Sequence, residues 1–408
     1  MTATTDPVAR PAPRIAQLDI IRGLAVMGIL VANLPAFALP AAAYFSPLAW
    51  GGTGVADRIA WFVTFVLVEG KMRGLFSMLF GASMLLVMDR AAAGGRSPAA
   101  VHLARMAALF AIGLVHLYLI WWGDILAHYA LVGTVALAFA RARIRLLLFV
   151  SGVLLLIDLV LATSVAAMLV ATPSPATGSM VAAVVRGFGV PPQAELIAEV
   201  DAYRTSFVTA TRFRLAHAGT PLDGLYVFGL QTLSAMLLGM AAFRSGFLPG
   251  GWSRATYRRI ALIARGKTMP LYTLLAWHSK AGGFGYRRIF LASIVLGPVL
   301  RPVTTVGYAA LALAAVRGDG RWSARIAAVG RAAFSNYIGT SLAMLLLFTG
   351  AHRFGTLSRA QLYVLAPPIW AFMLWWSPWW LHHFGQGPLE RVWRSIADAP
   401  WQMRTRRN

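Results

Sequence analysis

Long apolar runs alternate with short basic clusters along the chain, and this pattern predicts helices that cross a lipid bilayer. A spanning helix needs about 20 mostly apolar residues, because ~30 Å of hydrocarbon is crossed at ~1.5 Å per residue. Such runs cannot be the alternating strands of a barrel, so helices must satisfy the backbone polar groups in lipid. We expect an all-α membrane protein, a polytopic bundle of about ten transmembrane helices at residues 19–39, 57–90, 103–121, 124–141, 145–170, 222–243, 258–278, 289–316, 333–350 and 361–381.

The second apolar run, 57–90, is too long for one straight crossing and carries charged residues in its middle. Glu69, Lys71 and Arg73 lie there around Gly70. Because ionisable side chains inside a continuous span are costly, we expect the helix to break near Glu69-Gly70-Lys71.

The basic clusters fall on alternate connections between the expected spans, as the positive-inside rule requires. Counting the spans then places both termini in the cytoplasm. The chain divides into a disordered cytoplasmic N-terminus (1–13), a transmembrane domain (14–381) and an interfacial C-terminal helix with a basic tail (382–408). Its one long connection, 172–221, would be a periplasmic loop that contains an amphipathic helix.

Composition supports the membrane assignment and narrows the chemistry. Hydrophobic residues make up 58% of the chain and charged residues 12%, about half the charged share of a soluble domain. The net charge of +23 would suggest nucleic acid in a soluble protein. Here the basic residues flank apolar runs, where anionic headgroups attract them, so we expect membrane lipids and no nucleic acid as partners. The chain has no Cys, which excludes thiolate chemistry, and we expect no metal.

Polar side chains in the first helix form a stripe. Asp19 and Arg22 are three residues apart and therefore neighbours on one face. Asn33 returns to within about 40° of that face, roughly 20 Å further along the axis. All three are candidate substrate-binding residues; the alternative is an Asp–Arg pair that fixes the helix end and an Asn that bonds a neighbouring helix.

A second polar cluster, His116, Asp124 and His128, lies at the predicted periplasmic ends of the third and fourth spans. Asp124 and His128 are four residues apart, so we expect them on one face. An Asp that holds an imidazole in one tautomer is the arrangement of a general base. His116 and Asp124 are therefore the catalytic candidates and His128 a substrate-binding one, whereas a capping Asp124 and a packing His116 are the alternatives.

The helix break and the ninth span complete the candidate set. Glu69, Lys71 and Arg73 would bring charge near the same end, where Lys71 or Arg73 could hold an anion or stabilise an oxyanion. Asn336 and Tyr337 could line a cavity, although a role in joining helices is favoured.

Asp158 stands alone in the fifth expected span. We expect it to pair with a buried partner such as an Arg rather than to relay protons. The sequence carries no P-loop, HExxH or GxSxG motif, which argues against nucleotide-driven transport and zinc-protease chemistry.

At these motifs the chain resembles the YeiB-like family of bacterial inner-membrane proteins, and the resemblance covers nearly the whole chain. It implies a multi-pass protein of the bacterial inner membrane. The matching stretches are Leu18-Asp19-Ile20-Ile21-Arg22-Gly23 with Asn33, Glu69-Gly70-Lys71-Met72-Arg73-Gly74-Leu75-Phe76-Ser77-Met78-Leu79-Phe80-Gly81, His116 with Gly123-Asp124-Ile125-Leu126, Gly330-Arg331, Ser335-Asn336-Tyr337, and Gly387-Pro388-Leu389-Glu390 with Trp393-Arg394.

The first helix of that family is similar to that of transmembrane acyltransferases, including the lysosomal heparan-α-glucosaminide N-acetyltransferase. The shared feature is the spacing of Asp19, Arg22-Gly23 and Asn33. The resemblance implies an enzyme that takes an acyl group from cytosolic acyl-CoA and delivers it to an acceptor on the far side of the membrane.

Two departures from these patterns bear on the site. The acetyltransferase has its catalytic His in the loop after the shared Asn, where this chain has Tyr44. His116 or His128 would have to substitute for it. The family's usual Gln after the Asn-Tyr pair is Thr340 here.

We therefore expect a transmembrane acyltransferase with acyl-CoA as donor and a periplasmic or membrane-embedded acceptor, which would be a small molecule, a glycan or a lipid. Asp19, Arg22 and the basic loops would hold the phosphates of coenzyme A, and His116 would act as the base. The rival hypothesis is a secondary transporter or permease for a small metabolite or lipid. A scaffold subunit is the third interpretation. The oligomeric state is not fixed by the sequence, and a homodimer is the assembly that we consider.

Overall fold

The computed structural model describes residues 15–172, 179–315 and 320–405, and all regular structure within them is helical. The expected N-terminal segment 1–13 lies outside the described residues. In chain order the elements are α1 (Ala16–Ala38), η1 (Ala41–Tyr44), α2 (Val55–Leu67), α3 (Lys71–Ala93), α4 (Pro98–Val115), η2 (His116–Ile120), α5 (Leu126–Ala136), η3 (Leu137–Phe139), α6 (Ile144–Ala171), α7 (Met180–Phe188), α8 (Gln193–Thr205), α9 (Phe207–His217), α10 (Pro221–Arg244), α11 (Arg254–Ala281), α12 (Tyr286–Phe290), η4 (Leu291–Leu296), α13 (Gly297–Ala315), α14 (Arg321–Arg331), α15 (Ala333–Leu345), η5 (Leu346–Gly350), α16 (Arg359–Tyr363), α17 (Ala366–Phe384) and α18 (Pro388–Thr405).

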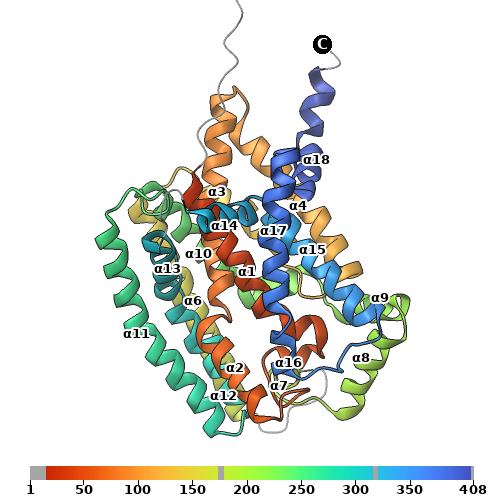
Figure 1. Cartoon of the computed structure of the whole chain (residues 1–408). Helices are drawn as coiled ribbons and strands as arrows, with labels where there is room; N and C mark the ends of the chain where they lie inside the picture. Colours follow the sequence, from red (N-terminus) through yellow and green to blue (C-terminus); the bar gives the residue numbers. More distant parts are fainter. Residues whose placement is uncertain (1–14, 173–178, 316–319, 406–408) are drawn as a thin grey trace, which may run out of the picture.

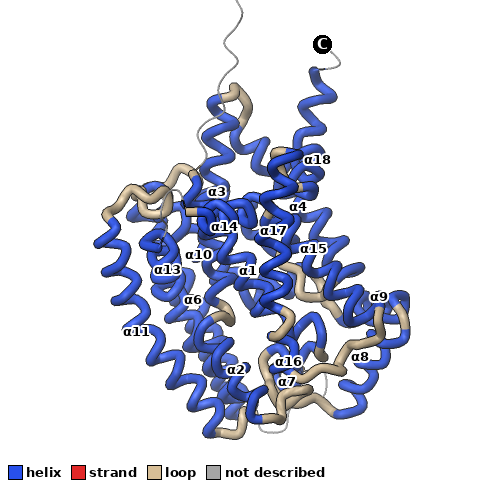
Figure 2. Tube along the Cα trace, in the orientation of Figure 1, coloured by secondary structure: helices blue, strands red, loops and turns tan. Residues whose placement is uncertain are grey.

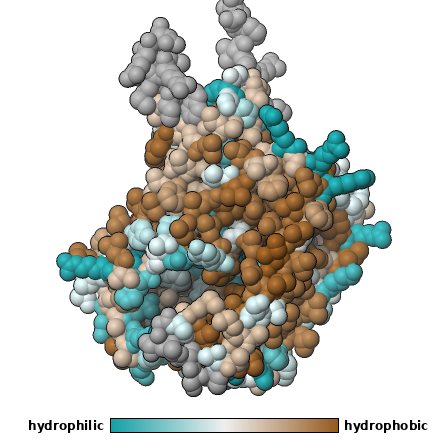
Figure 3. Space-filling model, turned by 180° about the vertical axis from the view of Figure 1, so that it is seen from behind, coloured by the Kyte–Doolittle hydropathy of each residue, from teal (hydrophilic) through white to brown (hydrophobic). Residues whose placement is uncertain are grey.

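The fold is an all-α bundle of the membrane type, as the sequence predicted. Helices run roughly side by side through the middle of the molecule, and most loops gather at its two ends (Figures 1 and 2). The start of α1 and the end of α18 lie toward the same end, whereas α7, α12 and α16 lie at the other (Figure 1). Brown, hydrophobic side chains spread over the middle of the face seen from behind (Figure 3).

The number of spans is about seven rather than the expected ten. Seven helical segments of the described chain are long and apolar enough to cross a membrane. They are Ala16–Ala38, Val55–Ala93, Pro98–Ile120, Ile144–Ala171, Pro221–Arg244, Tyr286–Ala315 and Ala333–Gly350.

The three remaining predictions, 124–141, 258–278 and 361–381, were wrong as independent spans. The first became a helical segment of only Leu126–Phe139, too short for ~30 Å of hydrocarbon. The second lies within α11, whose 28 residues include five basic ones before its proline, and charges inside a span are costly. The third falls on α16 and α17, where tryptophan, histidine and proline replace a continuous aliphatic run.

The expected break in the second run is confirmed. α2 ends at Leu67 and α3 begins at Lys71. Between them Gly70 has φ +70°, a left-handed conformation that glycine adopts without steric cost. A Cβ on Gly70 would also lie 2.6 Å from a guanidinium nitrogen of Arg301. The chain therefore needs glycine here both to turn and to admit Arg301.

α1 lies at the centre of the bundle and packs closely on α14 and α3. At the crossing with α14 the two backbones touch through glycines. A Cβ on Gly330 would lie 1.8 Å from the Asp19 carbonyl oxygen, and one on Gly23 would lie 2.2 Å from that of Ile326. Absence of these side chains lets the charged end of α1 approach α14.

The described part of segment 172–221 forms three short helices, α7, α8 and α9. Ser206 separates α8 from α9, and its side chain accepts a hydrogen bond from the Thr209 backbone at 3.1 Å, a normal N-cap. Glu199 of α8 accepts a hydrogen bond of 2.9 Å from the backbone of Ala41. This bond ties α8 to the corner that follows α1.

Glu199 predicts a pH dependence of this region. Burial raises the pKa of the Glu199 carboxyl to about 7, above its value in an unfolded chain. Protonated Glu199 therefore contributes to the free energy of unfolding at low pH, and this contribution is lost as pH rises through about 7. We expect a higher melting temperature near pH ~5.5 than near pH ~8, with a smaller difference in Glu199→Gln. Glu195 is exposed on the same helix and provides the control. Glu195→Gln should show the same difference in melting temperature between the two pH values as the wild type.

Candidate functional site

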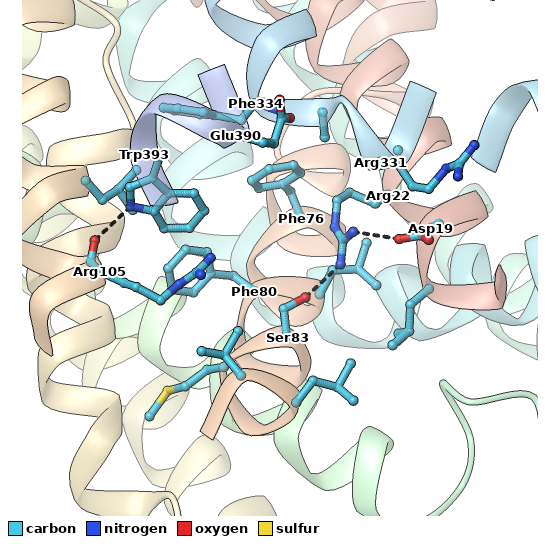
Figure 4. A pocket seen from close by; sticks show the side chains of 18 of the residues that line it. Asp19, Arg22, Phe76, Phe80, Ser83, Arg105, Arg331, Phe334, Glu390 and Trp393 are labelled. Carbon is cyan, nitrogen blue, oxygen red and sulfur yellow. Dashed lines mark hydrogen bonds and ion pairs between the residues drawn. The ribbon is translucent and has the colours of Figure 1, made fainter. Parts of the chain in front are cut away.

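A cavity of about 280 Å³ lies between helices that are far apart in the sequence. Its walls come from α1, α3, α4, α5, α14, α15, α17 and α18. Figure 4 shows labelled side chains from α1, α3, α4, α14, α15 and α18 around one space. The lining includes Asp19 and Arg22 from the predicted polar stripe and Tyr337 from the ninth predicted span. The structure thus brings three of the candidate residues to one cavity.

One part of the cavity is strongly basic. Five arginines in the described chain line it, against two carboxylates, Asp19 and Glu390. The arginines come from α1, α3, α4, α14 and α18, which are far apart in the sequence. They are Arg22, Arg90, Arg105, Arg331 and Arg394.

Both carboxylates already have partners. Asp19 accepts from Arg22 at 2.8 Å, and Arg22 also donates to Ser83 at 2.8 Å (Figure 4). Glu390 accepts from the backbones of Phe334 and Ser335 at 2.9 and 3.2 Å. These donors lie in the first turn of α15, so Glu390 caps that helix from α18. The positive charge at this end therefore exceeds what the lining carboxylates balance.

Trp393 holds α18 against α4 at the wall of the cavity. Its indole N–H donates to the Arg105 carbonyl at 2.9 Å, and the Arg105 guanidinium lies 4.2 Å from its ring centre (Figure 4). An ion pair between Arg96 and Asp398, 2.9 Å apart, joins α18 to the loop that precedes α4. The C-terminal helix is therefore part of the site and not an appendage.

The other part of the cavity is apolar and aromatic. Met106 and Leu109 of α4 line it together with Leu126 and Tyr129 of α5. The hydroxyl of Tyr129 is bonded to Ser77 at 2.7 Å. A ligand in this cavity would meet cationic donors at one end and a hydrophobic surface at the other.

His116 and Asp124 form a buried pair next to the cavity. Nδ1 of His116 lies 2.8 Å from Oδ1 of Asp124, and both side chains are 1% exposed. Asp124 Oδ2 accepts from the Ala127 backbone at 2.8 Å, so one carboxylate both starts α5 and orients the imidazole. The pair sits where α4 gives way to the π-helical turn η2, a distortion frequent at functional sites. Nε2 of His116 is buried and has no partner among the described residues.

Tyr337 connects this pair to the cavity. It lines the cavity, and its ring centre lies 5.3 Å from that of His116. Its buried hydroxyl makes no well-formed hydrogen bond within the described chain. Two unsatisfied polar groups, Nε2 of His116 and the Tyr337 hydroxyl, therefore belong to neighbouring rings at the edge of one cavity, and buried groups of this kind need an explanation.

His128 does not join the His116–Asp124 pair as expected. α5 begins only at Leu126, so Asp124 precedes the helix and the four-residue spacing does not place it beside His128. Nε2 of His128 is instead bonded to Thr232 of α10 at 2.8 Å.

The charged residues at the helix break also lie elsewhere. Lys71 is fully buried, donates to the Phe65 carbonyl and lies 3.3 Å from the ring centre of Tyr272. Arg73 stacks on Phe228 at 3.9 Å. Glu69 borders a separate small pocket. None of the three lines the main cavity, because the start of α3 packs against α2, α10, α11 and α13 rather than α15.

The two candidate asparagines are likewise outside the cavity lining. Asn33 is half-buried. Asn336 donates to the Val329 carbonyl and to Ser377, each at 3.1 Å, and accepts from Trp376 at 2.8 Å. Its amide is used to join α15 to α14 and α17, which is the structural alternative considered for it.

Sequence reasoning missed Trp393 and four of the five arginines that line the cavity. These arginines are Arg90, Arg105, Arg331 and Arg394. The arginines lie in clusters that the positive-inside rule already explained, so nothing marked them as ligand-binding. Arg331, Trp393 and Arg394 had one signal, the pair of C-terminal motifs Gly330-Arg331 and Trp393-Arg394 that carry the family resemblance, and Arg90 and Arg105 had none.

Comparison with known proteins identifies relatives along the chain. Residues 242–400 match a family described as "Protein of unknown function (DUF418)". The chain is 31% identical to "Uncharacterized protein YeiB" of Escherichia coli K12, over 93% of this chain and 95% of that protein. It is 29% identical to "Uncharacterized protein YxaH" of Bacillus subtilis 168, over 95% of each. No solved structure matches.

Proposed function

The chain belongs to the YeiB-like family of membrane proteins, and on that premise we propose that it is a transmembrane acyltransferase. The donor is cytosolic acyl-CoA, and the acceptor is a small molecule, glycan or lipid in the periplasm or within the membrane. The carrying observation is the cavity that combines five arginines with Tyr337, which packs on the His116–Asp124 pair.

The basic end of the cavity suits the donor. Arginine guanidinium groups bind phosphate in a bidentate manner, and coenzyme A carries several phosphates. Trp393, Phe76 and Phe334 add flat apolar surface beside the arginines (Figure 4). The apolar part of the cavity would take the chain that leads to the thioester.

His116 is the general base in this proposal. Asp124 holds the Nδ1 proton, which leaves Nε2 as the acceptor nitrogen. Nε2 takes the proton from the acceptor hydroxyl or amine as that atom attacks the thioester carbonyl. The carbon–sulfur bond then breaks, and the coenzyme A thiolate takes the proton back from His116. The Tyr337 hydroxyl replaces Lys71 and Arg73 as the donor for the developing oxyanion.

The proposal also implies how the protein is oriented in the membrane and which membrane it occupies. The arginine-rich end would face the cytoplasm, where acyl-CoA is available and where the positive-inside rule puts basic residues. The start of α1 and the end of α18 would then both face the cytoplasm of a bacterial inner membrane, an arrangement that needs an even number of crossings and therefore one besides the seven apolar segments. The common end of α1 and α18 supports this arrangement (Figure 1).

Donor binding tests the proposal directly. Detergent-purified protein should bind labelled acetyl-CoA and transfer or slowly hydrolyse its acyl group. Arg394→Gln should weaken binding about tenfold or more, since a hydrogen bond to a charged group contributes about 1.5–3 kcal/mol. Arg391 lies on the same helix outside the cavity lining, and Arg391→Gln should bind normally. An absence of acyl-CoA binding with every acceptor class tried would refute the acyltransferase.

A secondary transporter is the second candidate function. The observation that favours it is a buried polar chain in the bundle, in which Gln231 donates to Asp158 at 3.1 Å and accepts from Arg301. Buried charges in transporters bind substrates or coupling ions. Uptake of a solute by proteoliposomes, together with no acyl-CoA turnover, would favour this candidate.

A further inference from the structure

A second, much smaller cavity lies between α3, α6, α10 and α13, separate from the main one. Its volume is about 20 Å³, room for about one water-sized occupant. The polar residues lining it are Arg73, Ser77, Gln231, Thr232, Ser234, Arg301 and Thr305. No carboxylate belongs to the lining in the described chain.

Two buried polar groups of the lining are unsatisfied. Arg301 is 8% exposed and Thr305 is 2% exposed. The Arg301 Nε–H has no acceptor, and the Thr305 hydroxyl has no partner, among the described residues. Native proteins leave few such atoms without a partner, so an unplaced occupant is the simplest account of both.

Arg73 adds further donors. Its guanidinium stacks on Phe228 at 3.9 Å, and no hydrogen bond or ion pair of that guanidinium is found within the described chain. A guanidinium has five N–H donors, no acceptor, and does not lose its proton in proteins. Donors of two arginines and a hydroxyl therefore border one small space.

Asp158 does not satisfy these donors directly. Gln231 stands between the carboxylate and Arg301, donating to Asp158 at 3.1 and 3.3 Å and accepting from Arg301. The expected Asp–Arg partnership is thus indirect.

The lining of this cavity is positively charged. Arg73 and Arg301 belong to it, whereas the carboxylates of Glu69 and Asp158 do not. Two guanidinium charges therefore border one small space without a carboxylate beside them, in surroundings where an unbalanced charge is expensive.

We propose that this cavity binds one small monovalent anion of the size of chloride. Arg73, Arg301 and the Thr305 hydroxyl are the donors, and the anion balances the charge of the two guanidinium groups in the lining. The volume excludes phosphates and carboxylic acids of metabolic size. The inference is independent of the acyltransferase, because it rests on other residues.

Salt exchange tests the anion site in the purified full chain. At constant ionic strength, replacing gluconate by chloride should raise the melting temperature in a saturable manner, because a ligand that binds only the folded state stabilises it. Bromide should act like chloride, and sulfate should not. Radioactive chloride should be retained at about one ion per chain, the stoichiometry of one such cavity.

Two variants and a control locate the site. Thr305→Val keeps the shape of the side chain and should weaken chloride binding several-fold; Arg73→Gln should abolish retention of the labelled ion. Arg265 is an exposed arginine of α11, and Arg265→Gln should behave as wild type. If Arg73→Gln does not fold, the Thr305→Val titration decides. Equal melting temperatures in chloride and gluconate, with no retained ion, would overturn the proposal, as would an unchanged chloride affinity in Thr305→Val.

Discussion

Replacing His116 with alanine should lower the rate of acyl transfer by about 10²–10⁴-fold while donor binding stays close to wild type. The imidazole is the group beside the cavity with an unpartnered nitrogen and a carboxylate at 2.8 Å on its other nitrogen. The arginines that would hold the donor lie at the other part of the cavity. The change should therefore appear in kcat and not in the dissociation constant for acyl-CoA, measured by single-turnover kinetics and equilibrium binding.

Asp124 should act through His116. Asp124→Asn keeps the size of the side chain and leaves an acceptor for the Ala127 N–H, but removes the charge that stabilises the imidazolium. We expect a fall in kcat together with a change in the pH–rate profile, which a purely structural loss would not produce. His383 is exposed on α17, and His383→Ala controls for loss of an imidazole. Wild-type turnover in folded His116→Ala would remove His116 from the mechanism.

The helices of the fold were largely predictable because lipid imposes one simple requirement. The runs 19–39, 145–170 and 222–243 became α1, α6 and α10 with boundaries shifted by a few residues. Apolar character alone predicted too many spans, however. It could not separate a helix that crosses lipid from α5, which is too short, or from α11, which carries five basic residues before its proline.

The site was predictable only where its residues are close in sequence. His116 and Asp124 are eight residues apart, and Asp19 and Arg22 are three apart, so a turn or a helix face brings each pair together. The cavity needs α1, α4, α15 and α18 to meet, and the apolar pattern carries no information on which helices are neighbours. The prediction for His128 was wrong for a local reason. Residues four apart share a face only within one helix, and α5 begins at Leu126, between Asp124 and His128.

The glycine crossing between α1 and α14 leads to the second large effect. Gly330→Ala would place a methyl group 1.8 Å from the Asp19 carbonyl oxygen and 2.7 Å from the Gly23 nitrogen. Both are backbone atoms, which cannot rotate away, so the two helices must separate. Overpacking of this kind costs about 1–3 kcal/mol. Because Asp19, Arg22 and Arg331 flank the crossing, we expect a lower melting temperature and weaker acyl-CoA binding together.

A glycine in open space is the matched control. Gly339 lies in α15, exposed, with nothing within 4 Å of an added Cβ. Gly339→Ala should be neutral or stabilising by about 0.5–1 kcal/mol, since alanine is the better helix former. Thermal unfolding in detergent and acyl-CoA titration of both variants show whether the close approach of α1 and α14 matters for stability and donor binding. If Gly330→Ala melts and binds as Gly339→Ala does, the close approach of α1 and α14 does not shape the basic end of the cavity. A loss confined to Gly330→Ala instead makes backbone contact between these helices a condition for donor binding.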